Sequence, residues 1–162
     1  MSTPTHTPTQ PLPSPSSAPI PPAVAWLGYG GLLPFLALAA VGLWSPSAPW
    51  WSAALLAYGA VILSFVGALH WGFAMAQSGL SAPERTRCFV WSVVPSLLAW
   101  PAMLLAPVPG SVLLIAGFAA HLVQDHRLAA RTSLAAWYLP LRWRLTVTAC
   151  VCLAVGAWAA SS

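Results

Sequence analysis

Five long apolar stretches follow a proline-rich start of the chain, and short turns or polar segments separate them. We place them at residues 23–44, 50–76, 88–105, 108–124 and 145–160. A helix needs roughly 20 apolar residues to cross a bilayer, with a range of about 17–25. The last two stretches are short, so we expect them to borrow flanking residues or to lie in thinner membrane. The pattern predicts an all-α integral membrane bundle of five transmembrane helices over residues 23–162.

Proline marks the boundaries of this pattern. Residues 1–22 hold eight prolines, with Ser and Thr in most gaps, and such a tail cannot bury a core. We expect it to be disordered. Pro46 and Pro49 end the first stretch, and Pro107 and Pro109 separate the third from the fourth. A re-entrant hairpin over residues 88–124 is the alternative to two spans there.

The charged side chains favour two spans over that hairpin. Charged residues make up 5% of the 162 residues, whereas soluble proteins average about 25%. With five spans, the tail and the segments 77–87 and 125–144 share one side of the membrane and hold all six arginines. The positive-inside rule then places the N-terminus in the cytoplasm and the C-terminus outside a bacterial inner membrane.

The net charge of +4 would suggest nucleic acid as the partner of a soluble protein. Here the arginines flank apolar spans, so the lipid bilayer is the expected counter-charge and no nucleic acid is expected. Tryptophans lie near the ends of the stretches, as interfacial aromatic residues do. These are Trp26, Trp44, Trp50, Trp51, Trp137 and Trp143.

The second stretch has the most ordered pattern. Small residues recur at every fourth position along one side: Ala60, Ser64, Ala68 and Gly72. Such spacing lets another helix approach closely. His70 lies on the other side, in line with Gly59 and Gly67. Two faces of this helix are therefore expected to pack against protein, which predicts that it is the central helix of the bundle.

His70 is also a candidate for chemistry, because ionisable groups within spans are costly and often functional. His121 and Asp125 are four residues apart and share a helical face. The topology places His70 and His121 toward the same, cytoplasmic leaflet. A His–His–Asp cluster could bind a metal or haem iron, relay protons, or position a group that meets a partner. The structural alternative is that His70 bonds to a nearby carbonyl or Ser and that Asp125 pairs with a loop arginine.

The segment 126–144 interleaves arginine with aromatic residues, as in Trp137-Tyr138 followed by Arg142-Trp143-Arg144. Such a composition suits a segment that lies in the membrane interface. We expect an anchor that sets the start of the last helix. A docking surface for anionic lipid or a partner is the sharper alternative.

Several stretches together resemble a known family. They are LGYGGLLPF at 27–35, YGAVILSFVGALHWG at 58–72, Gln124-Asp125 and the segment from Trp137 to Thr146. Over about residues 24–160 the chain resembles the domain of unknown function 3429, which bacterial membrane proteins share with the mitochondrial transmembrane protein 69. The resemblance implies a small multi-spanning membrane protein and supplies no activity. It points to His70, Trp71, Asp125 and Arg142 as positions for polar or partner contacts.

These observations favour a non-enzymatic role. No phosphate-binding loop, zinc signature or nucleophile elbow is present in the sequence. We expect an accessory or assembly factor for a larger membrane complex, with no cofactor by default. The alternative is a cofactor protein in which His70 and His121 hold haem or a metal.

Overall fold

The computed structural model describes residues 19–48 and 50–162, and this part of the chain folds into helices without strands. The helices are α1 (Pro22–Gly30), α2 (Leu33–Trp44), α3 (Trp51–Ala76), α4 (Ala82–Ala102), α5 (Pro107–Ala129) and α6 (Tyr138–Ala159). The all-α architecture agrees with the pattern of apolar stretches. Most of the tail for which disorder is expected lies outside the described residues, and Pro22 already belongs to α1.

Helices α1 and α2 together form the first apolar segment, with a short break between them. Pro34, near the start of α2, has no N–H to continue the hydrogen-bond ladder of α1. The hydroxyl of Tyr58 on α3 donates to the carbonyl oxygen of Gly31 at the break, at 2.8 Å. The break is therefore tied to the neighbouring helix rather than left without partners.

Four helical segments in the described residues are long and apolar enough to cross a membrane: Pro22–Trp44, Trp51–Ala76, Pro107–Ala129 and Tyr138–Ala159. Five such spans are predicted from the sequence, and α4 is not among these four. It has 21 residues, but Glu84, Arg85 and Arg87 all lie within its first six positions. The chain is thus a helical membrane protein with at least four apolar segments of spanning length.

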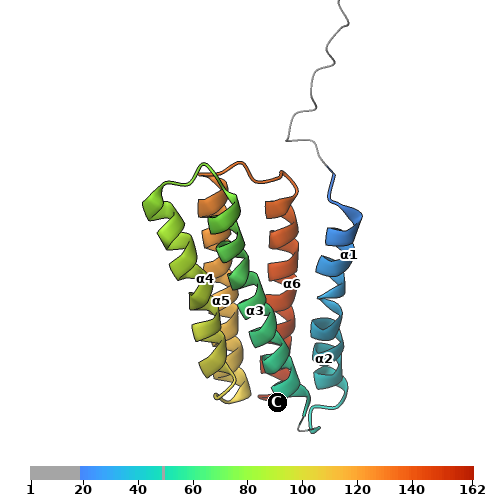
Figure 1. Cartoon of the computed structure of the whole chain (residues 1–162). Helices are drawn as coiled ribbons and strands as arrows, with labels where there is room; N and C mark the ends of the chain where they lie inside the picture. The colour runs from blue at the N-terminus through green and yellow to red at the C-terminus, as the bar shows by residue number, and fades with distance from the viewer. Residues whose placement is uncertain (1–18, 49) are drawn as a thin grey trace, which may run out of the picture.

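Figure 1 shows α3, α4, α5 and α6 as a bundle, with the α1–α2 segment along one edge. Helix α3 packs against α2, α4, α5 and α6, as expected for a central helix. The ends of α3 and α5 and the starts of α4 and α6 meet at the same end of the bundle. The charged residues of the sequence belong to this end, which we call the charged end.

The interior away from the charged end is apolar. Phe35, Leu55, Leu63, Leu114 and Leu153 are almost fully buried there. Glycines allow the helices to approach closely at two points. A Cβ atom at Gly67 would lie 2.7 Å from Pro95 Cγ, and one at Gly110 would lie 2.6 Å from the Ala102 carbonyl oxygen. Both positions therefore need a residue without a side chain.

The expectation that both small-residue faces of α3 are packed against protein is only half right. The face that carries Gly59, Gly67 and His70 is buried. On the other face Ala60 is buried, but Ala68 and Gly72 are exposed. Trp51 is expected from the sequence to lie in the membrane interface. In the structure it is instead 1% exposed, and its ring lies over Gly42.

Two helices extend beyond the apolar stretches. Helix α5 continues to Ala129 and α6 begins at Tyr138, so the connection between them covers only residues 130–137. Helix α4 begins with a capping box, in which the backbone N–H of Ser81 donates to Glu84 Oε2 at 3.0 Å. The Ser81 hydroxyl donates to the same oxygen at 2.6 Å. Hydrogen bonds from the side chain and backbone of Ser81 lower the pKa of Glu84. Glu84 precedes residue 88, where the predicted membrane span begins.

Candidate functional site

Four helices bring polar side chains together one to three turns below the charged end. The contributors are His70 from α3, Trp91 from α4, His121 and Asp125 from α5, and Tyr138 and Arg142 from α6. We call this group the polar cluster. At 1.5 Å per helical residue, Asp125 and Arg142 lie about 6 Å from their helix ends, and His121 lies about 12 Å from its own. The cluster is therefore set within the bundle and not at its surface.

Asp125 is the centre of the cluster and is 0% exposed. Its Oδ2 accepts a hydrogen bond from Arg142 Nε at 2.7 Å, and its Oδ1 accepts one from the Tyr138 hydroxyl at 3.1 Å. Arg142 is itself only 6% exposed. The predicted pairing of Asp125 with an arginine is present, but the arginine belongs to a helix and not to a loop. The pair fastens α5 to α6 from within.

His121 has a defined hydrogen-bond role. The indole N–H of Trp91 donates to His121 Nδ1 at 3.0 Å. Because an indole nitrogen only donates, Nδ1 must accept, and a neutral His121 then carries its proton on Nε2. That nitrogen points toward Asp125 Oδ1, 3.6 Å away. The Trp91–His121 hydrogen bond thus links α4 to α5, and the Nε2–H of His121 faces the carboxylate from just beyond hydrogen-bond distance.

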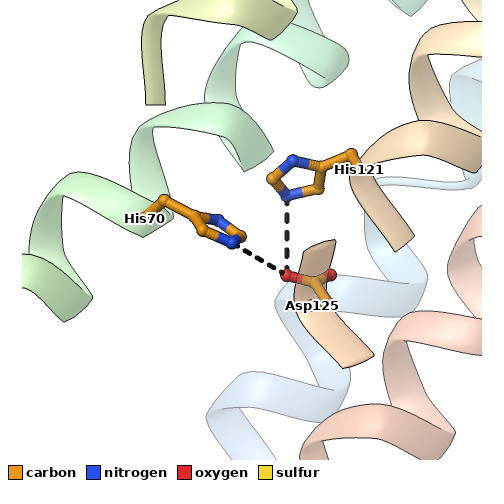
Figure 2. Close-up of side chains that lie close together, drawn as sticks. All are labelled: His70, His121 and Asp125. Carbon is orange, nitrogen blue, oxygen red and sulfur yellow. Dashed lines mark ion pairs between the residues drawn. The ribbon is translucent and has the colours of Figure 1, made fainter. Parts of the chain in front are cut away.

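His70 completes the cluster from the central helix. Figure 2 shows its ring and that of His121 both directed toward the same oxygen of Asp125. His70 Nε2 lies 3.9 Å from Asp125 Oδ1, and the two imidazole rings are 4.8 Å apart. His70 is 2% exposed, and neither of its ring nitrogens has a hydrogen-bond partner among the described residues. The expected bond from His70 to a carbonyl or Ser is therefore not formed.

Two cavities border the cluster. The smaller, of about 110 Å³, touches Arg142 and Thr146, whose buried Nη2 and Oγ1 atoms lack partners among the described residues. It has room for water, which is the usual partner of such groups. The larger, of about 490 Å³, extends from His70 and Trp91 to the arginines of the charged end. The cluster thus meets the larger cavity at His70 and Trp91.

Of the residues singled out in the sequence, His70, His121, Asp125 and Arg142 meet in the cluster. Trp71 does not, because it lies on the outer side of α3, 49% exposed, with its ring edge-to-face against Phe89 at 4.8 Å. Trp91 and Tyr138 are members that sequence reasoning missed. Trp91 is the fourth residue of the stretch 88–105, where a tryptophan is typical of the membrane interface, so the sequence held no clear signal for its role in the cluster.

Three potential metal ligands converge in the cluster: His70, His121 and Asp125 offer atoms within 4.8 Å of one another. Two imidazoles and one carboxylate are a donor set that transition metals accept. The surroundings fit an ion less well. Trp91 directs the proton of His121 onto the nitrogen that would bind the metal, and Arg142 already neutralises the carboxylate. A porphyrin fits worse still, because the two rings are in contact with each other.

A helical bundle of apolar segments around a buried His–Asp–Arg cluster defines a multi-pass membrane protein. The chain belongs to the family of proteins of unknown function DUF3429, whose model matches residues 20–158. It is 36% identical over 135 residues to "Transmembrane protein 69" of Xenopus tropicalis, covering 80% of this chain and 51% of that protein. The chain therefore spans about half the length of the curated relative it matches. No solved structure matches the chain.

Proposed function

We propose that the chain crosses a bacterial inner membrane five times, with its N-terminus in the cytoplasm and its C-terminus outside. The composition of α4 supports the fifth span, because its residues from Cys88 to Ala102 carry no charged side chain and the charged residues of its first six positions can lie at the membrane surface. In Figure 1, α4 runs beside α3 and α5 over most of their length. All six arginines belong to the charged end, which the positive-inside rule places in the cytoplasm.

Reporter fusions after Gln77, Ala106 and Ser162 test this topology. A reporter that is active only in the cytoplasm should be active after Gln77 and inactive after Ala106 and Ser162. An external signal after Gln77 together with a cytoplasmic one after Ser162 would reverse the orientation. A cytoplasmic signal at all three positions would remove α4 from the spans.

Within this topology the protein acts as a non-enzymatic accessory or assembly factor for a membrane complex. The observation that carries this proposal is the outer face of α3, which combines small and large apolar residues at alternating spacings of four and three. The face consists of Val61, Phe65, Ala68, Gly72 and Met75, all of them exposed. A Cβ atom at Gly72 would meet nothing within 4 Å. Small residues at helical spacing are how membrane helices approach one another, so this face suits a helix of a partner.

Ala68→Leu tests the partner face. The side chain is exposed, so we expect the variant to fold and insert normally while the larger residue holds a partner helix away. Ala154→Leu is the matched control, because Ala154 is an exposed alanine on α6. After gentle extraction and native sizing, the wild type and the control should run as a complex and Ala68→Leu as a smaller species. A wild-type protein that runs as a free monomer after crosslinking would refute the proposal.

The convergence of His70, His121 and Asp125 supports a second candidate, a protein that binds a metal through histidine. Both nitrogens of His70 and the Nε2 of His121 lack partners among the described residues, which is the observation in its favour. In such a site His70, His121 and Asp125 would hold the ion, with Arg142 and Tyr138 fixing the carboxylate. The ion would supply Lewis-acid or redox chemistry when bound.

Metal analysis and an absorption spectrum of protein expressed with copper, iron and haem supplied decide between the two candidates. Colourless, metal-free protein would remove the second candidate. A bound metal that is lost in His70→Ala, with membrane insertion unchanged, would support it. Without a metal, His70→Ala should affect stability alone.

A further inference from the structure

The larger cavity has the composition of a binding site for an anion. Its volume is about 490 Å³, and it lies between the end of α3, the start of α4 and the end of α5. Three arginines reach its rim, against a single carboxylate, Glu84. Arg87 belongs to α4, Arg127 to the last turn of α5, and Arg131 to the connection that follows α5. Farther along α4 from this rim, the lining includes the apolar side chains of Val90 and Trp91. A cationic rim above an apolar wall matches the order of charge and hydrocarbon in a phospholipid.

Most of the arginine side chains at this rim are not held by hydrogen bonds or ion pairs to the residues that the structure describes. Arg131 pairs with Glu84 at 3.7 Å, with its own side chain 48% exposed. Arg87 and Arg127 make no hydrogen bond or ion pair with any residue that the structure describes. By contrast, Arg85 donates to the carbonyl oxygens of Ala74 and Gln77 and so fixes the end of α3. Two guanidinium groups are thus free to bind an external anion.

The inner wall of the cavity provides a second, independent indication. His70 lines the cavity, is 2% exposed, and has no hydrogen-bond partner for either ring nitrogen among the described residues. A buried polar group is normally hydrogen-bonded, so a group of this kind facing a cavity indicates a ligand or solvent partner. An N–H of His70 can donate to an anionic oxygen that enters from the rim.

We propose that this cavity binds a phosphate group, with Arg87 and Arg127 as its main contacts and His70 as the donor at the inner wall. Guanidinium groups bind phosphate through paired, charge-assisted hydrogen bonds, which favours phosphate over a simple halide. The rim lies at the charged end, where the headgroups of an anionic phospholipid are located. The same chemistry would accept free phosphate from the cytoplasm. The cavity is separate from the α3 face to which we assign a partner helix.

Binding is measured on full-length protein in nanodiscs of phosphatidylcholine, with either phosphatidylglycerol mixed in at increasing fractions or inorganic phosphate added to the buffer. Native mass spectrometry counts retained anionic lipids, and melting temperature reports binding in both arms. We expect Arg87→Gln and Arg127→Gln each to weaken binding about fivefold, the factor for about 1 kcal/mol per arginine near a membrane surface. Both side chains are exposed and unpaired, so the variants should fold.

Arg144→Gln is the matched control, because Arg144 lies at the same end of the bundle but does not line the cavity. Loss of binding in the cavity variants with little change in Arg144→Gln supports the site, and the arm that responds identifies the phosphate as lipid or free. An equal loss in Arg144→Gln would overturn the proposal, because general surface attraction would then explain the binding. So would a protein that shows no response in either arm.

The depth of binding is tested by ¹⁵N spectra of labelled histidine. A phosphate that reaches the inner wall should shift the resonances of His70 and leave those of the exposed His126 unchanged. Unchanged His70 resonances in protein that has bound the anion would overturn the role of His70 as a donor.

Discussion

Removing one partner of the Asp125–Arg142 pair should be far more damaging than removing an average polar contact in a membrane bundle. Arg142→Met leaves the Asp125 carboxylate with only the Tyr138 hydroxyl within hydrogen-bond distance, at 3.1 Å, in a position that is 0% exposed. An unpaired buried charge costs about 3–5 kcal/mol, whereas an average interhelical hydrogen bond in a membrane is worth about 0.6 kcal/mol. The two magnitudes are easily separated by experiment.

A double-mutant cycle of Arg142→Met and Asp125→Leu measures the coupling. Each single variant leaves one buried charge without its partner, but the double variant leaves none. We therefore expect each single change to lower the free energy of unfolding by about 3–5 kcal/mol, and the double variant to be much less destabilised than the sum of the two. Reversible unfolding in mixed micelles, followed by tryptophan fluorescence, is the assay.

The exposed pair between Arg131 and Glu84 is the internal control. Their atoms are 3.7 Å apart, and the side chains are 48% and 29% exposed. Arg131→Gln should therefore change stability by no more than about 1 kcal/mol. If Arg142→Met were as mild as this control, or if the double variant equalled the sum of the single variants, the argument from buried charge would be wrong.

Three further predictions follow from the packing and hydrogen bonds. Gly110→Ala should lower the free energy of unfolding by about 1–3 kcal/mol, because its Cβ would lie 2.6 Å from the Ala102 carbonyl oxygen. Gly72→Ala should be neutral or mildly stabilising, and thermal melting compares the two variants. Trp91→Phe removes the donor to His121 Nδ1, so ¹⁵N spectra should show His121 losing its single fixed tautomer; an unchanged spectrum would contradict the assigned hydrogen bond. Ser81→Ala should raise the pKa of Glu84 toward its ordinary value in a pH titration. In the native protein the lowered pKa of Glu84 stabilises the fold above the ordinary carboxyl pKa, and this contribution is lost as pH falls through the folded value. The loss should be smaller in the variant, which keeps only the bond from the backbone N–H of residue 81.

The apolar stretches predicted the helices well and their ends poorly. The predicted boundaries stop near the first polar residues, at 124 and 145. The structure extends α5 to Ala129 and begins α6 at Tyr138. Charge was taken as a sign of a loop, but Asp125 and Arg142 neutralise each other across two helices. A pair of this kind cannot be recognised from one residue at a time, because each charge alone would be expelled from the apolar interior.

What the sequence determined are properties of single helices, and what only the tertiary structure decided are contacts between helices. Helical periodicity and the segregation of arginine specify a membrane bundle, and the spacing of His121 and Asp125 places both on one face, because these are properties of a single helix. That His70 meets them, that Trp91 fixes the tautomer of His121, and that Ala68 and Gly72 stay uncovered depends on how the helices rotate against one another. Those rotations are set by close contacts such as Gly67 on Pro95, which involve residues far apart in the chain and have no local signal in the sequence.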